Sequence, residues 1–141
     1  MIYLNSGINS DSKKSTIIPE QPWLSKYKVD KEKVHPILSE CRVFKSEDEL
    51  KVMKYACQAA AEGHVQVMKH CKPGLMESYL ASVMRAQGSA DYNVKLKPYG
   101  DILASGKNSA TLHYVDNNMI IKENQFVLCD CGHMVKRGRM K

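Results

Sequence analysis

One long amphipathic pattern in the middle of the chain limits the folds that this sequence can adopt. It opens with Ser46 and Glu49, whose S-x-x-E spacing forms a capping box that satisfies backbone donors at a helix start. Apolar or small residues then recur at steps of three and four, at Leu50, Met53, Cys57, Ala60, His64, Val67 and Cys71. Pro73-Gly74 ends the pattern. The sequence therefore predicts a helix over residues 46–72 with one face against a core.

A second, shorter helix is predicted for residues 74–87. Its apolar side consists of Met76, Tyr79, Leu80, Val83 and Met84. We expect Gly88-Ser89 to end it, and beyond this point the helical period disappears. Residues 94–106 look extended, and residues 125–131 have the composition of a strand. Two helices followed by antiparallel strands indicate an α+β fold rather than a doubly wound parallel sheet.

The first part of the chain carries weaker signals. Residues 2–4 resemble the end of a strand, and residues 11–36 are polar and interrupted by Pro19, Pro22 and Pro36. This composition is typical of a connector.

Composition excludes several classes of protein. The formal charge is +6, but Lys136, Arg137, Arg139 and Lys141 supply four of these charges, so the remainder carries only +2. This distribution argues against a nucleic-acid role, because proteins that bind nucleic acids spread basic residues over a face. No stretch reaches the roughly 20 apolar residues of a membrane helix. The five cysteines are irregularly spaced and no secretory signal precedes them. We expect reduced thiols and a cytoplasmic location.

The strand over residues 125–131 carries the first candidate for chemistry. Side chains alternate along a strand, so Val127, Cys129 and Cys131 share one face, and Leu128 and Asp130 share the other. Asp130 is either solvated at the end of the sheet or presents a hard oxygen ligand to Mn²⁺ or Mg²⁺. The two cysteines are either small core residues or, with His133, thiolate and imidazole ligands of a metal.

His113 is the second candidate, because it follows a polar loop in the segment SATLHY. A lone histidine of this kind is usually a structural residue, and both interpretations stay open. Ser109 lacks a G-x-S-x-G elbow, which argues against a serine hydrolase.

Three segments together resemble the prolidases, the Xaa-Pro dipeptidases among the pita-bread metallopeptidases, which also include aminopeptidase P and methionine aminopeptidase. They are E-C-R-V-F-K-S-x-x-E-L from Glu40, G-x-N-S-A-x-L-H-Y from Gly106, and F-V-L-C-D-x-G from Phe126. The resemblance implies a partial pita-bread fold and hydrolysis of Xaa-Pro dipeptides by a dinuclear centre, typically of Mn²⁺. It implies that Asp130 is the first metal ligand, that His113 is the active-site histidine beside the substrate, and that Tyr99 is a pocket tyrosine.

The resemblance also has limits. The resemblance implies a second aspartate about eleven residues after Asp130, but this chain has GHMVKRGRMK up to that place. The remaining ligands, a histidine and two glutamates, are expected further on. We therefore expect a chain truncated at both ends and inactive by itself. Residues 1–38 would end an amino-terminal domain and connector, residues 39–133 would form the first half of the catalytic domain, and residues 134–141 would be an atypical basic tail. The alternative is a non-catalytic relative that binds peptides or proteins. A homo-oligomer is possible on either interpretation.

Overall fold

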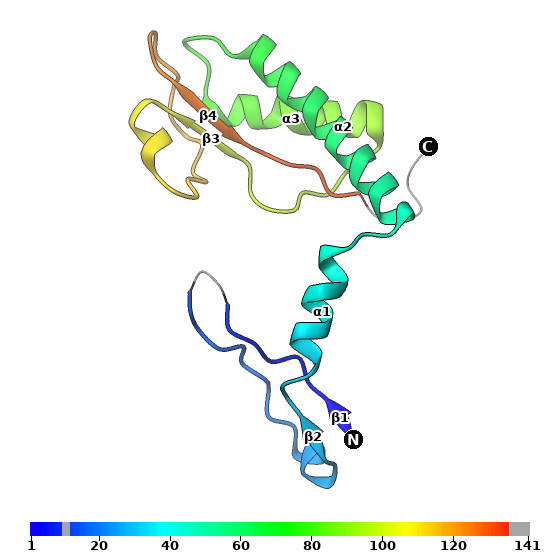
Figure 1. Cartoon of the computed structure of the whole chain (residues 1–141). Coiled ribbons are helices and arrows are strands. Elements are labelled where there is room, and N and C mark those ends of the chain that lie inside the picture. The colour runs from blue at the N-terminus through cyan, green and yellow to red at the C-terminus, as the bar shows by residue number, and fades with distance from the viewer. Residues whose placement is uncertain (10–11, 136–141) are drawn as a thin grey trace. The chain divides into compact units, whose positions relative to one another are not determined.

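The computed structural model describes residues 1–9 and 12–135 (Figure 1). The chain divides into two compact units, Met1–Glu47 and Asp48–Lys141, which we describe separately. Most of the predicted basic tail, residues 136–141, lies outside the described residues. Among the helices that the structure describes, none is both long enough and apolar enough to cross a lipid bilayer.

The first unit contains a small parallel sheet and one helix. Strand β1 (Ile2–Tyr3) pairs with β2 (Val29–Asp30), and the 3-10 helix η1 (Pro22–Lys26) precedes β2. Helix α1 (Val34–Val43) follows and begins inside the segment that the sequence presented as a connector. Pro36 is compatible with this helix because it lies in the first turn, where its missing N–H has no partner within the helix.

Two helices form one layer of the second unit. Helix α2 (Glu47–His70) begins directly after Ser46, as the capping box predicts, and its buried residues are Ala59, Gly63 and Val67. The predicted stripe is buried only toward its C-terminal end, since Leu50 and Met53 are about half exposed. Helix α3 (Glu77–Tyr92) passes through Gly88 and ends at Asn93, so the predicted end at Gly88-Ser89 is wrong.

The second layer is a two-stranded antiparallel sheet, as the sequence predicts. Strand β3 (Ile102–Ser105) is buried along its whole length and pairs with β4 (Val127–Asp130). In this register Ile102 lies opposite Asp130, and Ser105 lies opposite Val127. Leu128 and Asp130 are exposed while Val127 and Cys129 pack against the core, which confirms the predicted alternation.

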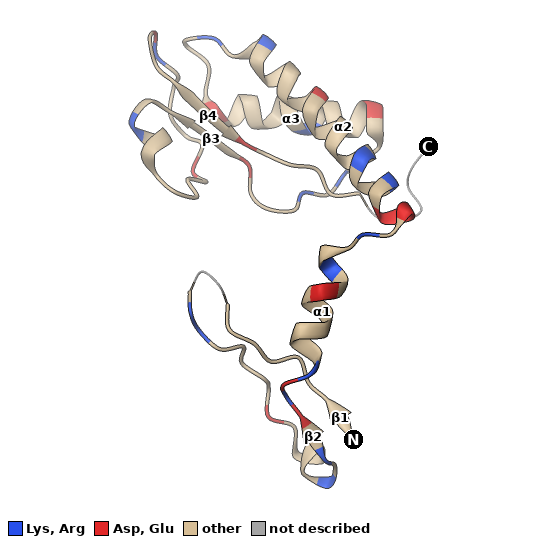
Figure 2. Cartoon of the chain, viewed as in Figure 1, with Lys and Arg blue, Asp and Glu red and all other residues tan. Residues whose placement is uncertain are grey.

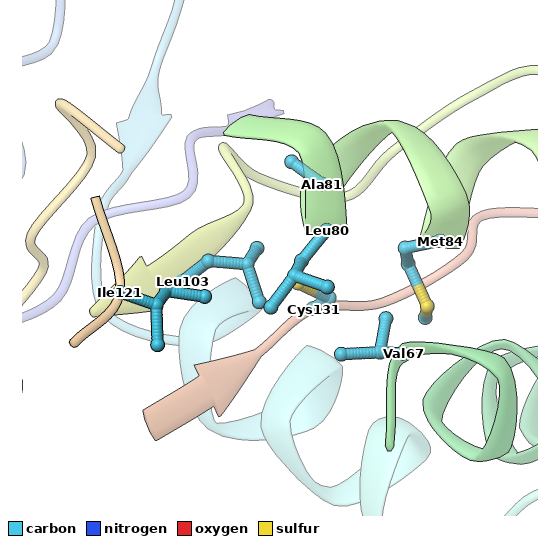
Figure 3. Packing of buried hydrophobic residues seen from close by; sticks show 7 residues of the cluster. All are labelled: Val67, Leu80, Ala81, Met84, Leu103, Ile121 and Cys131. Atoms are coloured by element: carbon cyan, nitrogen blue, oxygen red, sulfur yellow. The ribbon is translucent and has the colours of Figure 1, made fainter. Parts of the chain in front are cut away.

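The core lies between the helices and this sheet (Figure 3). Both helices, the sheet and the segments on either side of β4 contribute to it: Val67, Leu80, Ala81, Met84, Leu103, Ile121 and Cys131. A smaller cluster of Ile102, Ala104 and Tyr114 occupies the other side of β3. Strand β3 is therefore covered on both faces, which explains why it lacks the polar alternation of β4.

A buried carboxylate joins three segments of this unit. Glu77, the first residue of α3, is 0% exposed. Its Oε1 accepts hydrogen bonds from the backbone N–H and the hydroxyl of Ser105, both at 2.6 Å. Its Oε2 accepts from the Tyr114 hydroxyl at 2.8 Å and from the Met119 N–H at 3.1 Å. Burial acts to raise the pKa of Glu77, but these four hydrogen bonds outweigh it, and the pKa lies below its ordinary value.

Helices α2 and α3 approach closely around the imidazole of His133. A Cβ at Gly88 would lie 2.5 Å from ring atoms of His133, and a Cβ at Gly63 would lie 3.5 Å from its Nε2. Nε2 is buried and has no hydrogen-bond partner among the described residues. Burial lowers the pKa of His133. Gly88 is therefore a packing residue inside α3 rather than a helix terminator.

Acidic and basic residues alternate along the described helices. Figure 2 shows positions of both signs on the ribbons of these helices in each unit. The expectation that the chain does not bind nucleic acid stays a prediction, because four of its basic residues lie outside the described part.

The close approach of Gly88 to His133 predicts that a side chain at position 88 lowers stability. We expect Gly88→Ala to lower the free energy of unfolding by about 1–3 kcal/mol, because the new methyl group displaces the His133 ring. This is the net loss after subtracting the gain of about 1 kcal/mol that alanine brings to a helix interior. Chemical denaturation measures the change. In a His133→Ala background the same substitution should be neutral or stabilising, and an equal loss there would exclude the contact as its cause.

The Glu77 carboxylate predicts a pH dependence. A lowered pKa in the folded state stabilises the protein above the ordinary pKa of 4.5, and this contribution is lost as the pH falls through the folded value. We expect Glu77→Gln to cost about 3 kcal/mol at pH 7, since an amide cannot accept all four hydrogen bonds. Thermal melts between pH 7 and pH 3 should show a smaller difference between the two proteins at low pH. A difference that grows on acidification would contradict this assignment.

Candidate functional site

Asp130 lies at the end of β4 with its carboxylate on the exposed face. The position follows from the pleat, because Cys129 and Cys131 on either side point toward the core and leave the aspartate facing outward. Pairing with Ile102 on β3 fixes the backbone at this point.

Tyr99 holds one oxygen of this carboxylate. Its hydroxyl donates a hydrogen bond to Asp130 Oδ1 at 2.7 Å. This bond, followed by burial, raises the pKa of Tyr99 to about 12, so the phenol remains a donor at neutral pH. Gly132 makes room for the ring, since a Cβ there would lie 3.4 Å from the Tyr99 hydroxyl oxygen and 3.2 Å from Pro98 Cγ. Two of the three predicted site residues are therefore in direct contact.

His113 follows the 3-10 helix η2 (Gly106–Ala110), which starts where β3 ends. The sequence suggested a short extended segment here, but His113 has a φ of +55°. Few non-glycine residues adopt this left-handed conformation, and those that do are frequently found at functional sites. The following residue, Tyr114, is 8% exposed and packs against Ile102 and Ala104.

His113 and Asp130 line the same pocket, which has a volume of about 260 Å³. Its walls also include Ser109, Ala110, Leu112 and Leu128. The pocket thus combines apolar surface with one imidazole and one carboxylate. All three predicted site residues lie around one point of the second unit.

Hydrogen bonds of the Asn117 side chain connect the loop after His113 to β3 and the residue before it. The side chain of Asn117 accepts a hydrogen bond from Leu103 N–H and donates one to the carbonyl of Asp101, both at 2.8 Å. Further along, Met119 and Ile121 exchange backbone hydrogen bonds with the segment that enters α3. The chain that follows His113 is therefore fixed to both β3 and the start of α3.

The residues around Asp130 do not make a complete metal site. Within residues 1–9 and 12–135, no group of three or more His, Cys, Asp or Glu side chains is arranged to hold a metal ion. Asp130 has the chemistry of one hard oxygen ligand, and several such ligands are needed for affinity. No catalytic step through a metal follows from these residues alone.

Cys129 of β4 and Cys131, which follows the strand, belong to the core. Cys129 and Cys131 place their sulfur atoms 3.8 Å apart on the face opposite Asp130, and Cys131 is buried. His133, the third member of the alternative metal site, instead lies against Gly63 and Gly88. The structure therefore favours two small packing residues over a thiolate site.

Sequence reasoning missed Glu77 and Asn117, which organise the loop that carries His113. An acidic residue in the first turn of a helix is ordinary, because it suits the helix dipole, so Glu77 gave no distinguishing signal. Asn117 lies in a polar turn, where asparagine is also common. Their partners are 28 to 42 residues away for Glu77 and 14 to 16 residues away for Asn117.

Known proteins resemble this chain over most of its length. Xaa-Pro dipeptidase from Homo sapiens is 34% identical over 130 residues, which cover 89% of this chain and 26% of that protein. Xaa-Pro aminopeptidase from Escherichia coli is 31% identical over 97 residues, covering 69% and 22%. The chain therefore spans about a quarter of the length of these relatives.

Solved structures share the fold. A putative aminopeptidase P from Bacillus anthracis aligns with a TM-score of 0.77 at 28% identity, covering 94% of this chain and 32% of that one. Aminopeptidase PepP of Pseudomonas aeruginosa aligns at 0.68 with 34% identity, covering 72% and 23%. The α+β assignment and the partial pita-bread fold are confirmed. Residues 51–140 match the description "Metallopeptidase family M24", and the chain belongs to that family.

Proposed function

We propose that this chain supplies one wall of the active site of an M24 peptidase that cleaves Xaa-Pro bonds, as a prolidase does. The observation that carries the proposal is the shared pocket of His113 and Asp130, two residues that lie in separate prolidase-like motifs. Tyr99, which donates a hydrogen bond to Asp130, is the third residue of the proposed site. Relatives named Xaa-Pro dipeptidase and Xaa-Pro aminopeptidase support this substrate class.

In this proposal Asp130 contributes one oxygen ligand to a dinuclear manganese centre whose other ligands lie outside the described residues. Such ions, when bound, supply the activation of water and the polarisation of the scissile carbonyl. Tyr99 occupies one side of Oδ1 and so orients the carboxylate, leaving its other lone pairs available. Residues 1–141 alone are then a fragment of the catalytic apparatus without peptidase activity.

The pocket suits a proline-containing dipeptide in its size and its chemistry. Ala110, Leu112 and Leu128 offer apolar surface for a small ring, and His113 offers a nitrogen for a hydrogen bond to the peptide. His113 therefore acts on the substrate side, opposite the carboxylate. The five free cysteines support a reducing, cytoplasmic location.

A second candidate is a binding module that holds a proline-containing peptide or a protein without cutting it. The observation in its favour is the presence of a formed pocket on a chain whose described residues hold no three-ligand group. A homo-oligomer would fit either candidate. Metal-dependent turnover separates the two.

The proposal predicts the behaviour of Mn²⁺ with this chain alone. We expect residues 1–141 to bind Mn²⁺ no more tightly than the Asp130→Ala variant does, because one carboxylate gives too few ligands for useful affinity. Isothermal titration calorimetry measures both. An affinity lowered tenfold or more by Asp130→Ala would mean that this chain already assembles a metal site.

A chimera tests the proposed role of the site directly. Residues 51–132 of this chain replace the matching segment of human Xaa-Pro dipeptidase, which supplies the remaining length. We expect Mn²⁺-dependent hydrolysis of Gly-Pro, and a loss of more than about 100-fold on Asp130→Ala, because even residues that merely support metal ligands cost 10–100-fold. Release of proline measures the rate.

Asp116→Ala is the matched control in the chimera, since Asp116 is also an exposed aspartate of the same unit. It should leave the rate unchanged. A folded chimera that hydrolyses Gly-Pro equally well with and without Asp130 would contradict the assignment. A folded chimera that binds the dipeptide but does not hydrolyse it would favour the binding module.

A further inference from the structure

His113 holds its unusual conformation without help from its own side chain. Before His113, the Thr111 N–H donates a hydrogen bond to the Asn108 carbonyl, and after it Tyr114 and Met119 donate to Glu77. Among the described residues, no hydrogen bond reaches the His113 imidazole ring. A non-glycine residue at a φ of +55° persists only where the surrounding structure imposes that conformation. The groups that impose it must therefore act through the neighbouring residues.

Tyr114 is the neighbour best placed to do so. It directly follows His113, is 8% exposed, and is fixed at both ends of its side chain. The ring packs against Ile102 and Ala104, and the hydroxyl donates to Glu77 Oε2 at 2.8 Å. The same oxygen accepts from Met119 N–H, where the loop returns to α3. One oxygen of Glu77 thus fixes the loop immediately after His113 and again five residues later.

The other oxygen of Glu77 reaches the sheet that carries Asp130. Oε1 accepts two hydrogen bonds from Ser105, the last residue of β3. Strand β3 pairs along its length with β4, and Ile102 lies opposite Asp130. A single carboxylate therefore connects the turn of His113 to the strand pair that ends at Asp130.

We propose that Glu77 is a positioning residue that holds His113 in register with Asp130 across the pocket, acting through Tyr114 and Ser105. This goes beyond the proposed function, because it concerns the geometry of the pocket whether or not a peptide is cut there. Its relevance to turnover rests on that proposed function. Glu77 itself touches neither the pocket nor any ligand in it, since its carboxylate is fully buried.

The test is the backbone conformation of His113 in the full chain, measured by nuclear magnetic resonance without metal or peptide. A positive φ brings the amide proton of a residue close to its own α proton, so His113 should give a strong cross-peak between them. We expect Glu77→Gln to weaken this cross-peak and shift the His113 Cα resonance, because the amide cannot accept from both Tyr114 and Ser105. Tyr114→Phe, which removes one arm, should produce a smaller change in the same direction.

Glu62→Gln is the matched control. Glu62 is another helical carboxylate that accepts a tyrosine hydroxyl, from Tyr92, and it lies on α2 away from the pocket. It should leave the His113 signals unchanged even if it lowers the melting temperature. Unchanged His113 signals in a folded Glu77→Gln variant would overturn the proposal.

Tyr114→Phe decides the question if Glu77→Gln does not fold. It keeps the packed ring and loses one hydrogen bond, a change that a folded domain tolerates. Unchanged His113 signals in Tyr114→Phe would then leave Glu77 with a purely structural role, and the proposal would fail. Because no step of this test uses peptidase activity, its failure and the failure of the chimera are distinguishable.

Discussion

The four hydrogen bonds to the buried Glu77 carboxylate are the constraint on which the second unit depends. An ionised carboxylate without access to water is costly unless each lone pair is used, and here backbone and side-chain donors use them. The donors come from the end of β3, from Tyr114 and from Met119. The start of α3, the sheet and the intervening loop are therefore joined at one point rather than through separate contacts.

The two faces of β4 differ in role, because one packs against the core and the other lines the pocket. The side of β4 that faces α2 and α3 carries Val127 and Cys129, and its other side carries Leu128 and Asp130. The polar groups of the pocket thus lie on a surface whose backbone is fixed from behind by the core. The Asp130 carboxylate, held by this backbone and by the Tyr99 hydroxyl, would lose little conformational freedom on binding a ligand, which favours affinity.

Much of this organisation was predictable from local sequence patterns. The long helix, the change of period after it, the final strand and the alternation along that strand all follow from side-chain spacing. Helix α1 was missed because Pro36 resembles a helix terminator. The end of α3 was placed too early because Gly88 also resembles a terminator, whereas in the structure it leaves space for the His133 imidazole inside the helix. The contact between Gly88 and His133 joins residues distant in the chain, so no local pattern predicts it.

The residues of the candidate site were likewise predictable only in part. Asp130 and His113 were candidates from strand alternation and loop composition, and the motif resemblance added Tyr99 and assigned a role to each. The structure brings the three together, but it does not test their roles. The residues that hold them in place, Glu77 and Asn117, were not predictable because their partners are distant in the sequence.

The alternation of β4 makes its register against β3 decisive. Successive side chains of a strand point to opposite faces, so a slip of one residue in this pairing would exchange the two faces of β4. A cysteine thiol would then face the pocket, and the aspartate would face an apolar interior that cannot hold it. The apolar face of the strand thus protects the position of the carboxylate, because burying Val127 and Cys129 specifies the one register that leaves Asp130 outside.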